Sequence, residues 1–259
     1  MGWIDSHCHL DFDEFSEEHD LTQRLITAGC DHILVPAISA NKFKRLQEFK
    51  NRSNRLNESF VYIALGLHPF FLKEHKLEDL SLLEALLENE SPLAVGEIGL
   101  DFLLESQSHE SQIHFFESQV RLAQKYKLPI IVHCRKAHDQ LCSILKRLKF
   151  SQGGIIHAFS GSTQQAQNYI QLGFVLGLGG ALTYDRAKAM HKMIKLLPEN
   201  AYVLETDSPD MAPSFAKGQV NTPFNIPQIA QHISELRGET VAQIFKASSQ
   251  NFKRVMKLS

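Results

Sequence analysis

Short apolar runs alternate with longer amphipathic segments along the whole chain, and this alternation restricts the fold more than any other feature. The segments between the runs place apolar side chains at helical spacing. Repeated strand–helix units whose strands are apolar on both faces predict a (β/α)8 TIM barrel, an α/β fold, with an open doubly wound sheet as the alternative. The runs that we expect to be strands are Trp3–Asp5, His32–Ala37, Phe60–Gly66, Leu93–Gly96, Pro129–His133, Gly154–Ala158, Phe174–Leu178 and Tyr202–Glu205.

Length and charge agree with one barrel of ordinary composition. The chain has 259 residues and no linker rich in Pro, Ser or Gly, so we expect a single domain over residues 1–259. We expect Asp210 to Pro227 to form one long functional loop after the last strand. The net charge of -2 gives no strong overall field for long nucleic acids, so a polyanionic substrate must be bound locally.

The cell compartment is indicated by two absences in the sequence. The chain starts without a basic segment followed by an apolar one, and no apolar run is long enough to cross a bilayer. Its four cysteines show no C-x-x-C spacing. We therefore expect a cytoplasmic protein with reduced thiols, no membrane contact and no obligatory protein partner.

Histidines and carboxylates recur where the expected strands end. Such residues at the carboxyl ends of barrel strands build active sites, since these ends share one face. Six nitrogen and oxygen ligands exceed the needs of a single zinc ion, so we expect two divalent metal ions, with Glu97 as a bridging ligand. The six candidate ligands are His7 and His9 after the first strand, Glu97, His133 and His157 at the ends of the fourth, fifth and sixth, and Asp207 beyond the eighth.

These motifs resemble those of the TatD-type metal-dependent deoxyribonucleases, a family of the amidohydrolase superfamily, and look closest to its bacterial YjjV-like branch. The resemblance covers nearly the whole chain. The sequence blocks that carry it are Asp5-Ser6-His7-Cys8-His9, Gly66-Leu67-His68-Pro69, Gly96-Glu97-Ile98-Gly99-Leu100-Asp101, His133-Cys134-Arg135, His157-Ala158-Phe159-Ser160-Gly161 and Glu205-Thr206-Asp207-Ser208-Pro209.

The resemblance implies a division of the ligands and an activity. His7, His9, Glu97 and Asp207 would hold one metal ion, and Glu97, His133 and His157 the other. The implied activity is metal-dependent removal of nucleotides from DNA ends, with other phosphodiesters as further substrates. Mixed imidazole and carboxylate ligands suit Zn or Mn, whereas Mg prefers oxygen. The family is associated with Mg or Mn, so the metal stays open among Mg, Mn and Zn.

Further residues have weaker assignments. As a hypothesis, Asp207 accepts the proton of the attacking water and is catalytic. His68 and Arg135 are candidate substrate-binding residues, because an imidazole and a guanidinium donate to phosphate oxygens. An orienting histidine and a structural salt bridge are the respective alternatives. Asp101 and Glu205 are candidates for orienting ligand histidines, although Glu205 also suits a structural ion pair.

Two other functions compete with the nuclease. The same metal cluster would serve an amidohydrolase that acts on a small-molecule ester, lactone or amide, because a fold does not determine its chemistry. A metal-containing binding protein without turnover is the second rival. The sequence disfavours it, since both the ligands and a candidate base are present.

Overall fold

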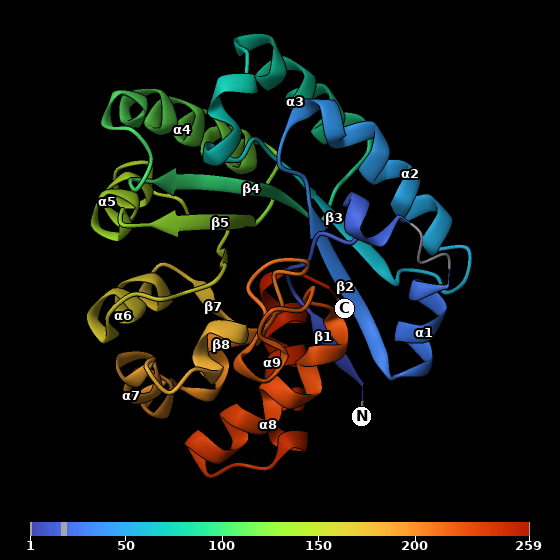
Figure 1. Cartoon of the computed structure of the whole chain (residues 1–259). Helices are drawn as coiled ribbons and strands as arrows, with labels where there is room; N and C mark the ends of the chain where they lie inside the picture. Colours follow the sequence, from blue (N-terminus) through green and yellow to red (C-terminus); the bar gives the residue numbers. More distant parts are fainter. Residues whose placement is uncertain (1, 17–19, 259) are drawn as a thin grey trace.

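The chain folds into a barrel of parallel strands surrounded by helices. The computed structural model describes residues 2–16 and 20–258. Its eight strands form one parallel sheet in the order of the sequence, which confirms the predicted (β/α)8 TIM barrel over the open sheet (Figure 1). The strands are β1 (Trp3–Asp5), β2 (Cys30–Pro36), β3 (Val61–Leu65), β4 (Ala94–Asp101), β5 (Ile130–Arg135), β6 (Gly154–Ile156), β7 (Phe174–Leu178) and β8 (Tyr202–Leu204).

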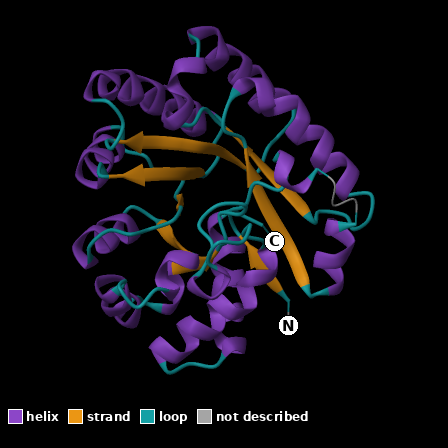
Figure 2. Ribbon diagram, in the orientation of Figure 1, coloured by secondary structure: helices purple, strands orange, loops and turns teal. Residues whose placement is uncertain are grey.

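Helices follow the strands and form the outer layer, as Figure 2 shows. Most are amphipathic and bury one apolar stripe against the strands. The helices are α1 (Leu21–Thr27), α2 (Phe43–Ser53), α3 (Leu77–Asn89), α4 (His109–Lys125), α5 (His138–Arg147), α6 (Thr163–Gln171), α7 (Lys188–Leu196), α8 (Ile226–Arg237) and α9 (Val241–Val255). Among residues 2–16 and 20–258, none of these helices is long and apolar enough to reach across a membrane.

The first and last strands meet through bonds at their carboxyl ends. The Ser6 amide donates to the Leu204 carbonyl at 3.0 Å, and the Asp207 amide donates to the His7 carbonyl at 2.9 Å. The buried Asp5 carboxylate accepts from the Thr206 amide at 3.0 Å and from its hydroxyl at 2.5 Å. These bonds tie the segment that carries His7 to the segment that carries Asp207.

The inside of the barrel is filled at the opposite end. Each strand contributes one buried apolar side chain to an inner cluster, which also contains Phe252, Val255 and Met256 from the end of α9. Phe252 is fully buried, and α9 therefore closes the floor of the barrel. The polar side chains buried inside the barrel lie at its other end, where the strands have their carboxyl ends. The eight strand residues are Ile4, Leu34, Ala64, Ala94, Ile131, Ile155, Val175 and Val203.

Several expected boundaries were wrong. β4 continues to Asp101 and β5 to Arg135, so Glu97 and His133 lie inside their strands rather than at the ends, and β6 already ends at Ile156. The register between β4 and β5 shifts between Val95 and Ile98, and pairing then resumes with Gly99 opposite His133. A side chain at Gly99 would lie 1.8 Å from the His133 carbonyl oxygen, so glycine allows the ladder to continue. The expected loop from Asp210 to Pro227 contains two 3-10 turns, and α8 already begins at Ile226.

Candidate metal centre

All six candidate ligands lie together at the carboxyl ends of the strands. His7 and His9 follow β1, His157 follows β6, and Asp207 lies three residues beyond β8. Glu97 and His133 lie within β4 and β5. The parallel order of the strands therefore brings together residues that are up to 200 positions apart in the chain. All of them surround one buried carboxylate, that of Glu97.

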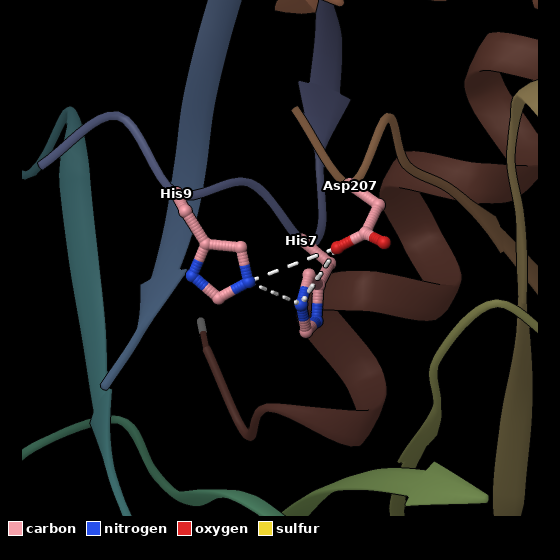
Figure 3. A group of neighbouring side chains, drawn as sticks. All are labelled: His7, His9 and Asp207. Atoms are coloured by element: carbon pink, nitrogen blue, oxygen red, sulfur yellow. Dashed lines mark hydrogen bonds and ion pairs between the residues drawn. The ribbon is translucent and has the colours of Figure 1, made fainter. Parts of the chain in front are cut away.

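His7, His9 and Asp207 form one side of the centre. The Nε2 atoms of the two histidines are 3.3 Å apart, and Asp207 Oδ1 lies 3.4 Å from His7 Nε2 and 3.7 Å from His9 Nε2. Figure 3 shows the two rings and the carboxylate converging on a common point. Glu97 Oε2 adds a fourth donor, 3.2 Å from His7 Nε2 and 3.6 Å from His9 Nε2. Cys8 is turned away into the core against the carbonyl of Leu34, as alternation predicts.

The second oxygen of Glu97 faces the other histidines. Glu97 Oε1 lies 3.3 Å from His133 Nδ1 and 3.4 Å from His157 Nε2. His68 Nε2 is nearer, at 3.0 Å. Because His68 Nδ1 accepts a hydrogen bond from the Phe70 amide, its Nε2 carries the proton and donates to Glu97. His68 thus contacts the central carboxylate directly, closer to the centre than the sequence predicts.

The donor set and its spacing suit divalent metal ions. Ligands placed about 2.1 Å from a tetrahedral ion lie roughly 3.4 Å from one another, which is the range observed around His7, His9 and Asp207. Burial lowers the pKa of His7 well below its usual value and that of His9 to about 4, so both rings are neutral. Neutral imidazoles are the form that binds metal. Within the described chain, the buried Nδ1 atoms of both rings have no hydrogen-bond partner.

Electrostatics keep the central carboxylate charged. Burial acts to raise the pKa of Glu97, but the surrounding histidines, His68 and His157 foremost, hold it well below its usual value. Burial likewise opposes charge on His157, but Glu97 and Asp207 raise its pKa to about 10. Burial raises the pKa of Asp207 to about 7. Without a bound ion, the charge of Glu97 is thus balanced by a proton on His157, and a divalent ion bound at the centre would take the place of that proton.

Two more carboxylates contact His133 and His157, each at the ring nitrogen that does not face Glu97. Asp101 Oδ2 lies 3.4 Å from His133 Nε2, and Glu205 Oε1 lies 3.4 Å from His157 Nδ1. Glu205 Oε1 also accepts from the Ala158 amide at 2.5 Å. Carboxylates in this position fix the ring orientation of a ligand histidine and raise its basicity. The sequence named both residues for this role but left Glu205 open.

Asp5 and Asn221 position the ligands and were not among the predicted site residues. The Asp5 carboxylate accepts from the His7 amide at 3.2 Å, and burial raises its pKa to about 8. The fully buried Asn221 amide donates to the carbonyls of Thr206 at 2.8 Å and Asp210 at 2.7 Å. Asn221 thereby fastens the long loop over the end of β8. Its signal in the sequence was weak, because a polar residue in a loop is ordinarily exposed.

Arg135 lies at the edge of the centre. Its side chain is 62% exposed, and Nη1 is 4.0 Å from Asp101 Oδ2. It does not touch Glu97, and its guanidinium is open to the solvent side of the barrel mouth. The contact with the buried Asp101 carboxylate is compatible with the alternative of a structural salt bridge, and the exposed guanidinium is compatible with substrate binding.

Known proteins resemble this chain over its whole length. A sequence model of the family described as TatD-related DNase matches residues 4–257. The uncharacterized metal-dependent hydrolase YjjV of Escherichia coli K12 is 39% identical over 252 residues, which cover 96% of this chain and 95% of that protein. An uncharacterized metal-dependent hydrolase of Haemophilus influenzae is 39% identical over 260 residues, 97% of this chain and 98% of its own length.

Solved structures give the same relationship. The crystal structure of the TatD homologue YjjV from Escherichia coli matches with a TM-score of 0.92 and 38% identity, over 99% of this chain and 98% of that chain. A TatD-family hydrolase from Entamoeba histolytica matches with a TM-score of 0.86 and 26% identity, over 98% of both chains. Together with the site geometry, these matches identify a metal-dependent hydrolase that belongs to the TatD-related DNase family.

Proposed function

We propose that this hydrolase removes nucleotides from DNA ends by cleaving phosphodiester bonds with two bound divalent ions. The observation that supports it most is the position of the Glu97 carboxylate, whose two oxygens face two separate groups of donors. A carboxylate in this position bridges the ions of two-metal hydrolytic sites. One ion would be held by His7, His9, Glu97 and Asp207, and the other by Glu97, His133 and His157.

Bound divalent ions would supply positive charge for the phosphate oxygens and lower the pKa of the attacking water. In this proposal Asp207 takes up the proton of that water through its carboxylate. Its Oδ1 atom lies 3.4 Å from His7 Nε2, so the carboxylate is next to the position where the metal-bound water would lie. Arg135 is the proposed substrate contact, and its guanidinium would donate to non-bridging phosphate oxygens. The Nε2 proton of His68 is already donated to Glu97, so we assign His68 to the orienting role, the alternative to substrate binding.

The identity of the metal is tested first. The donor set contains more imidazole nitrogens than carboxylates, which favours Zn or Mn over Mg. Elemental analysis of protein purified without added metal should give about two ions per chain. Activity after removal of these ions and separate addition of Mg, Mn and Zn then identifies the working metal.

The substrate class is tested with a panel under identical metal conditions. The panel compares single-stranded DNA, RNA, a nitrophenyl phosphodiester, a lactone and an amide, with Asp207→Asn as the inactive control. We expect shortening of DNA from an end and slower turnover of the nitrophenyl ester. Turnover of the lactone or amide with inert DNA would favour the small-molecule amidohydrolase. Stoichiometric metal without any turnover would favour the binding protein.

A further inference from the structure

A cleft opens at the barrel mouth beside the metal centre. It has a volume of about 590 Å³ and lies between the ends of β4 and β5, the first turn of α5 and the loop before α6. The residues that line it include Phe102, Leu103, Arg135, Lys136, Asp139 and Ser160. None of the six proposed metal ligands lines this cleft. The cleft is therefore a separate feature that the metal centre does not explain.

The cleft is positively charged. Arg135 and Lys136 both line it and are exposed. Within residues 2–16 and 20–258, Lys136 has no carboxylate at ion-pair distance, and the ion pair of Arg135 reaches only to Asp101 at 4.0 Å. The carboxylate in the lining belongs to Asp139, which accepts a hydrogen bond from Gln165 Nε2 at 3.2 Å. Arg135 and Lys136 outnumber the one carboxylate in the lining, so the cleft carries a small excess of positive charge that favours an anion.

One side chain joins the cleft to the centre. Asp101 Oδ2 lies 3.4 Å from His133 Nε2 and 4.0 Å from Arg135 Nη1. β5 carries His133 and Arg135 two positions apart, so both side chains face the same side of the strand. The cleft is therefore adjacent to the metal centre along β5, on the side that carries Arg135.

One wall of the cleft, next to Arg135, is apolar. Phe102 stacks on His109 with the ring centroids 4.0 Å apart, and Leu103 is 54% exposed beside it. An aromatic ring held in place in this way offers a surface on which a nucleic-acid base can stack. Two cations next to an apolar surface match a nucleotide, which presents both a phosphate and a base. An isolated inorganic anion would leave the apolar wall without a contact.

We propose that this cleft binds the nucleotide next to the scissile bond, with its phosphate on Arg135 and Lys136 and its base against Phe102. This inference rests on the proposed nuclease function. It assigns Lys136, which the metal centre does not use, to substrate binding.

The test measures how fluorescein-labelled oligothymidylate binds at several salt concentrations. Asp207→Asn serves as the background so that the probe is not cut. Adding Lys136→Gln should weaken binding about tenfold, through loss of a charge-assisted hydrogen bond, and reduce the salt slope by about 0.7, the value for one phosphate contact on a single strand. The matched control is Lys146→Gln, an exposed lysine near the other end of α5, which should change neither quantity.

Two further probes distinguish the possible ligands. Thymidine 5′-(4-nitrophenyl phosphate), which lacks the flanking nucleotide, should bind equally well to the proteins with and without Lys136→Gln. Inorganic phosphate should displace the oligonucleotide only weakly. An unchanged salt slope in Lys136→Gln, or inorganic phosphate binding as tightly as the oligonucleotide, would overturn the proposal.

This outcome is separable from the failure of the nuclease function. If the protein that retains Asp207 cuts no DNA, but oligothymidylate binding still depends on Lys136, the proposed nuclease function is wrong and the assignment of the cleft to nucleotide binding is supported. If DNA is cut, but the Lys136→Gln variant has the same oligothymidylate affinity and salt slope as the control, the nuclease function is supported and the assignment of the cleft is wrong.

Discussion

Gly177 in β7 provides a direct test of how the centre is supported, because it leaves room for the Glu205 carboxylate. A methyl group added there would lie 2.0 Å from Glu205 Oε2, whereas ordinary contacts begin at 3.4 Å. The backbone at Gly177 is in a conformation that other residues adopt, so Gly177→Ala adds the clash without backbone strain. The carboxylate must move by at least the difference, 3.4 minus 2.0, or 1.4 Å. Glu205 is 1% exposed and has no solvent to move into.

This displacement breaks two contacts at once. Glu205 Oε1 accepts from the Ala158 amide at 2.5 Å and lies 3.4 Å from His157 Nδ1. Leaving these buried groups poorly paired costs about 1–3 kcal/mol, and overpacking costs a similar amount. We expect Gly177→Ala to lower the free energy of unfolding by about 2–4 kcal/mol. Loss of the contact that orients a ligand histidine should also weaken metal binding about 10–100-fold.

Urea unfolding of the metal-free protein measures the first effect, and competition with a chromophoric chelator measures the second. The matched control is the double variant Gly177→Ala/Glu205→Ala. With the carboxylate removed, the methyl group has space, so its added cost over Glu205→Ala alone should fall to within about 0.5 kcal/mol. Costs that add in full would refute the reasoning, because Gly177 would then act independently of Glu205.

Three further variants test other parts of the structure. Asp207→Asn should lower turnover about 10²–10⁴-fold while circular dichroism stays unchanged, and near-normal rates would exclude it as the base. Asp101→Asn should weaken one of two metal sites about 10–100-fold in a metal titration, because Asp101 contacts His133, and two unaltered sites would contradict this. Phe252→Ala should lower the free energy of unfolding by about 3–5 kcal/mol in urea, because its ring fills the barrel floor. Its turnover in the native state should be unchanged, and a large loss would show that the floor and mouth are coupled.

The sequence predicted the fold and the grouping of the ligands for one physical reason. In a parallel barrel every strand ends on the same face, so a residue's place at a strand end fixes its place in space. This rule needs only the strand pattern, and in the structure His7 lies beside both His157 and Asp207 although they are far apart in the chain. The pattern of apolar runs therefore predicted proximity, whereas metal binding itself stays a proposal.

The length of β4 and the anchoring of the long loop depend on contacts between distant segments, which the pattern of residues along the sequence does not show. β4 was expected to end near Gly96, and a glycine such as Gly99 ordinarily weakens a strand. In the structure, Gly99 extends the strand, since it allows close approach of the His133 carbonyl. The anchoring of the loop by Asn221 depends on carbonyls at Thr206 and Asp210 that are free only in the folded barrel.

The extension of β4 and β5 links the metal centre to the cleft. Their register pairs Gly99 with His133 and, two positions further on, Asp101 with Arg135. The first pair lies at the proposed metal centre, and the second at the boundary of the cleft. Arg135 is therefore held by a strand, whereas Lys136 lies just beyond it in the turn to α5. A change of residue at Lys136 can alter which substrates bind without disturbing the ladder that places His133. Substrate range can thus vary while the chemistry of the centre is preserved, because the two properties depend on neighbouring but separate backbone positions.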